Sequence, residues 1–73
     1  MNAAQIGEVI LQRRKKLGLR QQELADLSEV NINTIVAIEK GEHNPKLSTL
    51  LAVGNVLGLE LIVQLRKIDY AKL

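Results

Sequence analysis

Five basic residues lie close together in the first third of the chain, and no acidic residue interrupts them between Val9 and Gln22. They are Arg13, Arg14, Lys15, Lys16 and Arg20. Guanidinium and ammonium groups at this density would bind a polyanion such as a nucleic acid through its phosphates. The alternative is a solvated helix end, where cations interact favourably with the helix dipole. The net charge of +2 does not decide between the two.

Residue types that serve catalysis or metal binding are scarce in this sequence. The chain has no Cys, which excludes disulfides and thiolate metal sites, and its single histidine, His43, cannot hold a metal ion alone. We find no Gly-rich phosphate loop and no plausible catalytic cluster. We therefore expect a protein that is not an enzyme and uses no metal or cofactor. For His43 the expected role is that of an exposed loop residue.

The length of 73 residues allows a single domain, residues 1–73, with a small core. A domain of this size buries only about 60% of its unfolded surface, and disulfides, metals or a partner subunit usually support it. Because Cys is absent, oligomerisation is the remaining device. The sequence has no apolar run that could span a membrane and no signal-peptide pattern, so we expect a cytoplasmic protein without membrane contact.

The apolar period and the capping residues predict four helices. Ile6, Ile10 and Leu17 fall on one face of the first helix, which Asn2 would cap and Gly18 would end. The predicted helices cover residues 3–17, 21–28, 32–40 and about 46 or 47 to 57.

The second and third predicted helices differ in the quality of their caps. The second would bury Leu24, Ala25 and Leu27, but Arg20 stands at its cap position, where Ser or Thr would be better. Asn31 is a good cap for the third helix, and glycines end the third and the fourth.

After residue 58 the apolar period changes to two. Leu59, Leu61, Val63 and Leu65 stand at alternate positions, which predicts a strand over about 59–67. A lone strand has unpaired backbone groups, so we expect it to pair with the same strand of a second copy, antiparallel across a two-fold axis. The alternatives are that the strand packs on its own domain, or that residues 59–65 extend the fourth helix.

The fourth predicted helix also favours a homodimer, because it is apolar nearly all round. Leu50 and Leu57 lie on one face, and Val53 and Val56 cover much of the rest. Such a helix is buried on more than one side, and one side would need a partner. The predicted dimerisation residues are Val53, Val56, Leu59, Leu61, Val63 and Leu65.

Two charged residues lie on faces that should be buried. Arg14 lies between Ile10 and Leu17 on the first helix, and Glu39 lies beside Ile38 on the inner face of the third. A lone buried charge would be costly, and the two residues have opposite signs. We therefore predict a buried salt bridge between Arg14 and Glu39 that fixes the angle of the third helix.

Two short helices joined by a tight turn occupy residues 21–40, with the sequence QQELADLSEVNINTIVAIEK. This motif, together with residues 6–58 around it, resembles the helix-turn-helix of the Cro and phage-repressor (XRE) family. The matching features are Arg14, Leu17-Gly18-Leu19, Gln21, Glu23-Leu24-Ala25, Val30, Asn31, Thr34-Ile35, Ile38-Glu39, Gly41, Pro45, Leu50 and Leu57-Gly58. The resemblance implies an all-α, four-helix, lambda-repressor-like DNA-binding domain, here with a short C-terminal strand for dimerisation.

The resemblance also implies a role for individual residues. The third helix would lie in the major groove, where Asn33 could read adenine and Ile32 and Val36 could pack on thymine methyl groups. Gln21 matches a position that contacts phosphate at a helix N-terminus. The candidate DNA-binding residues are Arg20, Gln21, Gln22, Asn31, Ile32, Asn33, Thr34, Val36, Lys40, Asn44 and Lys46.

The sequence departs from the family pattern at three places. Glu29 stands where the turn usually has Gly, and Arg20 replaces the usual cap residue. The outward positions of the third helix are poor in polar groups, with Asn33 and Thr34 as the candidates for hydrogen bonds to bases. The competing interpretation is that this helix binds DNA loosely or binds a protein.

The C-terminal half, NPKLSTLLAVGNVLGLELIVQL, resembles HipB-type antitoxins. That likeness implies a dimer that represses its own operon and binds a HipA-type toxin kinase. We expect a homodimeric transcriptional repressor that binds a two-fold site in double-stranded DNA. The alternatives are an antitoxin whose main role is to bind a toxin kinase, and a helical interaction module that no longer binds DNA.

Overall fold

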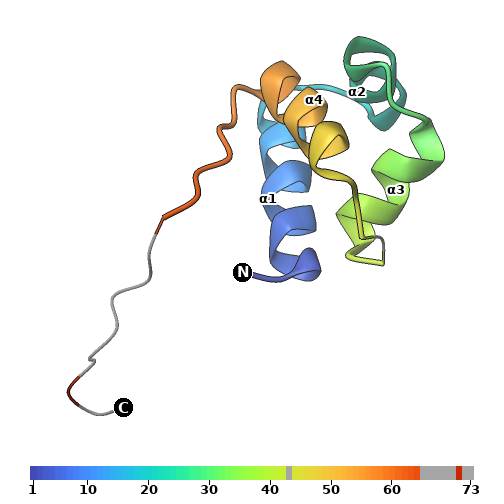
Figure 1. Cartoon of the computed structure of the whole chain (residues 1–73). Helices are drawn as coiled ribbons and strands as arrows, with labels where there is room; N and C mark the ends of the chain where they lie inside the picture. The colour runs from blue at the N-terminus through green and yellow to red at the C-terminus, as the bar shows by residue number, and fades with distance from the viewer. Residues whose placement is uncertain (43, 65–70, 72–73) are drawn as a thin grey trace.

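The computed structural model describes residues 1–42, 44–64 and 71, and within them four helices surround one core (Figure 1). The helices are α1 (Ala3–Lys16), α2 (Gln21–Ser28), α3 (Ile32–Lys40) and α4 (Leu47–Leu57). Their bounds agree with the predicted ones to within one residue, and the ambiguous start of the last helix falls at Leu47.

The first helix begins with the cap that the sequence predicts. The side-chain oxygen of Asn2 accepts a hydrogen bond from the backbone N–H of Gln5 at 2.9 Å, and the Gln5 side chain accepts one from the backbone N–H of Asn2 at 2.9 Å. This reciprocal pair satisfies two backbone donors that a helix start leaves free. It fixes where α1 begins, close to the end of α3.

α1 and α3 approach each other closely at Gly7. A Cβ atom built on Gly7 would lie 2.1 Å from the carbonyl oxygen of Ile38, inside any allowed contact distance. Only glycine lets the two backbones come this near, because it has no side chain. The contact sets the position of α3 relative to α1.

The core contains residues from all four helices. Its fully or nearly fully buried apolar members are Ile10, Leu24, Ala25, Ile35, Ile38, Val53 and Leu57. Two predictions of inward side chains were wrong, since Leu27 is 61% exposed and Leu17 is 45% exposed. Ser28 is buried in place of Leu27, and its hydroxyl donates to the Leu24 carbonyl oxygen at 2.6 Å. A side-chain hydroxyl that bonds back to its own helix can be buried at little cost.

The chain leaves α4 as an extended segment, residues 59–64, on the side of the molecule away from α3 (Figure 1). Two hydrogen bonds fix this exit: Leu59 N–H donates to the Gly54 carbonyl at 2.8 Å, and Arg13 Nε donates to the Leu57 carbonyl at 2.7 Å. The expected strand is not formed in residues 59–64 of the single chain. Residues 65–67 of that prediction lie outside the described residues.

Candidate nucleic-acid interface

The N-terminal half of α3 carries the polar side chain that could read a base. Asn33 is exposed, and its side chain makes no hydrogen bond within the described ranges. Asn31 caps the helix instead, since its side-chain oxygen accepts from the backbone N–H of Asn33 at 2.7 Å. Asn31 thus holds the start of α3, and the Asn33 amide is left with both donor and acceptor free. These are the groups that recognise adenine in the major groove.

The other outward positions of α3 are less exposed than Asn33. Ile32, Thr34 and Val36 are half-buried, and Ile32 packs against the edge of the core. Their apolar surface beside Asn33 could contact thymine methyl groups. The structure therefore places the four predicted base-contacting residues on one helix, and Asn33 is the most exposed of them.

The start of α2 offers backbone donors to an anion. The first N–H groups of a helix have no partner within it, and the helix dipole adds partial positive charge there. Gln21 is half-buried and Gln22 is exposed, and Gln22 Nε2 donates to Asp26 Oδ1 at 2.8 Å. The arrangement fits the phosphate contact that was predicted for this helix end.

Arg20 precedes α2 and pairs with Glu23. The Glu23 carboxylate accepts from the backbone N–H of Arg20 at 2.9 Å and from its Nε at 3.1 Å. These hydrogen bonds, the backbone one first, lower the pKa of Glu23. The carboxylate thus supplies the half of the cap that Arg20 cannot. The Arg20 side chain is 86% exposed, so the pair is weak and its guanidinium remains accessible.

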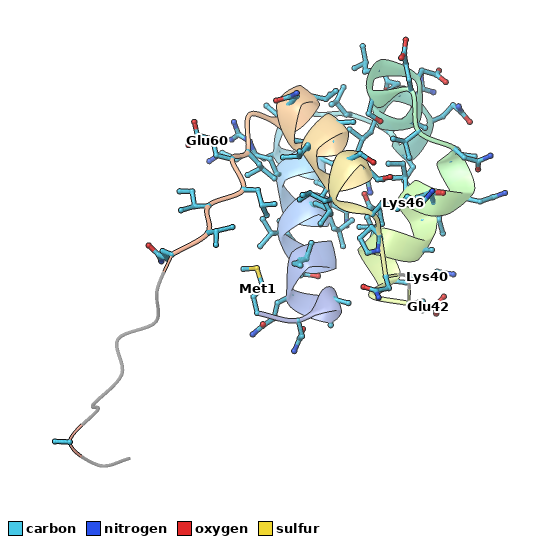
Figure 2. The ribbon with its side chains drawn as sticks, viewed as in Figure 1. Met1, Lys40, Glu42, Lys46 and Glu60 are labelled. Atoms are coloured by element: carbon cyan, nitrogen blue, oxygen red, sulfur yellow. The ribbon has the colours of Figure 1, made fainter. Side chains whose placement is uncertain are left out.

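Two lysines flank the connection between α3 and α4. Lys40 ends α3 and Lys46 precedes α4, and both are exposed, as is Asn44 between them. Figure 2 shows Lys40, Glu42 and Lys46 around this connection, far from Glu60 on the C-terminal segment. The two ammonium groups extend the potential anion contacts beyond α2. His43, for which a loop position was predicted, lies outside the described residues.

The predicted salt bridge between Arg14 and Glu39 is present in the structure. Arg14 Nε donates to Glu39 Oε2 at 2.6 Å and Arg14 Nη2 donates to Glu39 Oε1 at 2.9 Å, with Arg14 8% exposed. The hydrogen bond to Glu39 raises the pKa of Arg14 against the opposing effect of its burial. Arg14 Nη1 also donates to the Leu19 carbonyl at 2.8 Å. One guanidinium thus ties α3 and the α1–α2 connection to α1.

The turn between α2 and α3 uses Glu29 where glycine was expected. Glu29 adopts φ 57° and ψ 36°, the left-handed region, and is the non-glycine residue with positive φ among the described residues. Val30 N–H donates to the Ala25 carbonyl at 3.0 Å across it. The turn therefore has the geometry that a glycine would give, at the steric cost of a side chain.

On the opposite side of the molecule, α1, α4 and the C-terminal segment enclose an apolar groove of about 390 Å³. We call it the α1–α4 groove. Its lining includes Ile6 and Val9 of α1, Leu51 of α4, and Leu59 and Leu61 of the segment. The sequence pattern of α4 and the segment gave no sign that Ile6 and Val9, three positions apart on one face of α1, would line the same groove.

The predicted dimerisation residues divide between core and surface. Val53 is 0% exposed, so its assignment to a dimer face was wrong: it belongs to the core. Val56 and Leu59 are half-buried, while Leu61 is 49% and Val63 94% exposed. Leu65 lies outside the described residues. The apolar surface of this region thus lies mainly on the C-terminal segment.

The described part of the chain holds no cluster of three or more His, Cys, Asp or Glu side chains that could bind a metal ion. In the same residues, none of the helices has the length and apolar character needed to cross a membrane.

Comparison with known proteins identifies relatives of the whole domain. Residues 10–63 match the family model described as helix-turn-helix. An uncharacterized HTH-type transcriptional regulator of Methanothermobacter thermautotrophicus is 39% identical over 61 residues, which cover 84% of this chain and 88% of that protein. A second one, from Haemophilus influenzae, is 45% identical over 67 residues, 90% of this chain and 67% of that protein.

A phage protein is also similar. The immunity repressor protein of Bacillus phage phi105 is 36% identical over 56 residues, which cover 77% of this chain and 39% of the repressor. The four helices, the family model and these relatives agree: the chain belongs to the helix-turn-helix family and is a DNA-binding transcriptional regulator rather than an enzyme.

Proposed function

We propose that this protein is a transcriptional repressor that binds, as a homodimer, a two-fold symmetric site in double-stranded DNA. α3 enters the major groove and Asn33 contacts a base edge. The N-terminus of α2, with Gln21 and Gln22, contacts the phosphate backbone. The observation that carries the proposal is the Asn33 amide, exposed and free of hydrogen bonds within the described residues, beside the open N-terminus of α2.

Affinity and specificity come from different groups in this proposal. Arg20, Lys40 and Lys46 are exposed cations that would release counterions from phosphates, which makes the affinity dependent on salt. Asn31, Thr34 and Asn44 add polar groups near the backbone. Sequence preference rests on Asn33 and on the apolar surface of Ile32 and Val36, and we expect it to be modest and rich in A·T pairs.

Dimerisation would use the side of the molecule opposite α3. The α1–α4 groove is apolar and open, and Leu61 and Val63 beside it are 49% and 94% exposed. Surface of this kind is rare on a monomer and marks interaction sites. Pairing of residues 59–67 with the same segment of a second copy would cover it, with Val56 and Leu65 at the margins. Because α3 lies on the other side, both surfaces would be used at once.

Selection of bound duplexes from a random DNA library at about 100 mM salt tests the proposal. We expect enrichment of a two-fold site whose half-sites lie about 10 base pairs apart, one helical turn. In the same assay Asn33→Ala should relax the preference at one position of each half-site and leave binding to unrelated DNA unchanged. Enrichment of single half-sites would contradict the dimer, and no enrichment would contradict sequence-specific regulation.

A second candidate function is an antitoxin whose main partner is a toxin kinase of the HipA type, with DNA binding as autoregulation. The observation that favours it is the apolar character of α3 around Asn33, where Ile32 and Val36 are partly exposed. Asn33→Ala and Lys46→Ala together should weaken binding to the selected site, because they remove one base contact and one phosphate contact. If the double variant neutralises a toxin encoded beside it as well as the wild type does, the antitoxin role is separate from DNA binding.

A further inference from the structure

One side chain of the candidate DNA-binding surface is attached directly to the buried ion pair. Gln21, at the first position of α2, donates from Nε2 to Glu39 Oε1 at 3.0 Å. The same oxygen accepts from Arg14 Nη2 at 2.9 Å. The network therefore runs from α1 through α3 to the start of α2, and it ends at the residue that would meet a phosphate.

Glu39 determines which end of the Gln21 amide points inward. An ionised carboxylate only accepts hydrogen bonds, so the Gln21 nitrogen must face it and the amide oxygen cannot. The nitrogen carries two N–H groups, and the bond to Glu39 uses one of them. The second N–H remains for an acceptor outside the protein, next to the free backbone N–H groups of α2.

We propose, building on the function proposed above, that Glu39 is a positioning residue for DNA binding: it orients the Gln21 amide so that its second N–H donates to a backbone phosphate. Arg14 makes this possible by neutralising Glu39. The Glu39 side chain is 4% exposed and both of its oxygens accept from Arg14, so the negative charge is compensated before an anionic phosphate approaches.

Gln12 on α1 provides a matched control. It has the same side chain, and its amide nitrogen also donates to a carboxylate, Glu8 Oε1, at 2.8 Å. Both residues are exposed, and neither is a candidate DNA-binding residue. Loss of the Gln12 amide therefore reports what exchange of a surface glutamine for methionine does to binding, without the influence of Glu39.

The test compares three single variants of the full chain, Gln21→Met, Gln12→Met and Glu39→Gln, and the double variant that combines Gln21→Met with Glu39→Gln. Binding to a 20-base-pair random duplex is measured at about 100 mM salt, where circular dichroism shows each variant folded. Gln21→Met should weaken binding about tenfold, the effect of one hydrogen bond to a charged group, and Gln12→Met less than about twofold. In the Glu39→Gln background, Gln21→Met should have less than half of its original effect on log Kd.

Side-chain amide NMR of the DNA-free protein provides a second readout, and it remains valid if Glu39→Gln does not fold. The Gln21 amide protons should exchange with solvent more slowly than those of Gln12, because one of them is bonded to a buried carboxylate. A wild-type protein that binds DNA while Gln21→Met and Gln12→Met behave alike would overturn this inference alone. So would an equal Gln21→Met effect with and without Glu39. A wild-type protein that binds no duplex would overturn the proposed function and this inference together.

Discussion

The two sides of α1 meet the rest of the chain in opposite ways. Toward α3, Gly7 lies against the Ile38 backbone and Arg14 is bonded to Glu39, so both residues make their contacts within the chain. Toward α4 and the C-terminal segment, Ile6 and Val9 line an open apolar groove. The first side is closed by the chain itself and holds α3 in place. The second is left for another surface to cover.

The largest expected effect is on the closed side, at Glu39. Glu39→Ala leaves the Arg14 guanidinium buried without its carboxylate, and we expect a loss of about 3–5 kcal/mol of unfolding free energy, measured by urea denaturation. Arg20→Ala, which removes an exposed pair with Glu23, should cost at most about 1 kcal/mol.

Replacing both partners of the ion pair tests whether the unpaired buried charge causes this loss of stability. Arg14→Met combined with Glu39→Leu should recover most of the lost stability, because no unpaired charge remains. If the single and double variants were equally unstable, then the ion pair would not be what holds this side of α1 closed.

The second expected effect concerns the approach of α1 to α3. Gly7→Ala would bring a Cβ to 2.1 Å from the Ile38 carbonyl oxygen, so the helices must move apart, at a cost of about 3 kcal/mol. Gly18→Ala is the control: it has φ +71° but nothing within 4 Å of its Cβ, and it should cost only about 1 kcal/mol of backbone strain. Equal losses in thermal or urea unfolding would show that the helices are not in close contact here.

On the open side of α1 we expect a substitution to change the association of two copies and to leave the folding of each copy unchanged. Leu61→Asp removes apolar surface beside the α1–α4 groove, and we expect the dimer Kd to rise about tenfold or more in sedimentation equilibrium. The free energy of unfolding extrapolated to the monomer should not change. Leu27→Asp alters another exposed leucine, 61% exposed on α2, and should leave the dimer intact. A dimer that is indifferent to both substitutions would have its interface elsewhere.

The smallest expected effect is a gain in stability at the turn that sets α3 against α2. Glu29→Gly relieves the left-handed conformation at φ 57°, and the unfolding free energy should rise by about 0.5–1 kcal/mol despite the added chain entropy of glycine. The sign is opposite to that of Gly18→Ala at a comparable φ. A loss of stability would mean that the Glu29 side chain makes a stabilising contribution in spite of its backbone.

The sequence was sufficient for the parts of the molecule that local rules decide. Caps at Asn2 and Asn31 and the glycines after α3 and α4 gave the helix bounds, and opposite charges on two apolar faces predicted the Arg14–Glu39 pair. The periodic pattern failed where a face is only partly covered. Leu27 lies on a side of α2 where it remains 61% exposed, whereas the neighbouring Ser28 satisfies its hydroxyl within the helix and is buried instead.

Other features depend on distances that no pattern contains. Val53 was assigned to a dimer face because α4 is apolar nearly all round. The packing of α4 against the other helices decides which of its valines is buried in the core, and the sequence does not contain that information. The Gln21–Glu39 bond joins residues on two helices whose separation depends on the closed side of α1. The groove on the open side combines residues from both ends of the described chain, which are far apart in the sequence.

The start of α3 has a consequence for how such regulators diversify. Asn31 holds the helix by its cap, whereas Asn33 is exposed and its side chain makes no hydrogen bond among the described residues. Exchange of Asn33 for another side chain should therefore leave the scaffold intact. If Asn33 contacts a base as we propose, duplicated copies of the gene could acquire new operators by changes at this position without first acquiring compensating mutations.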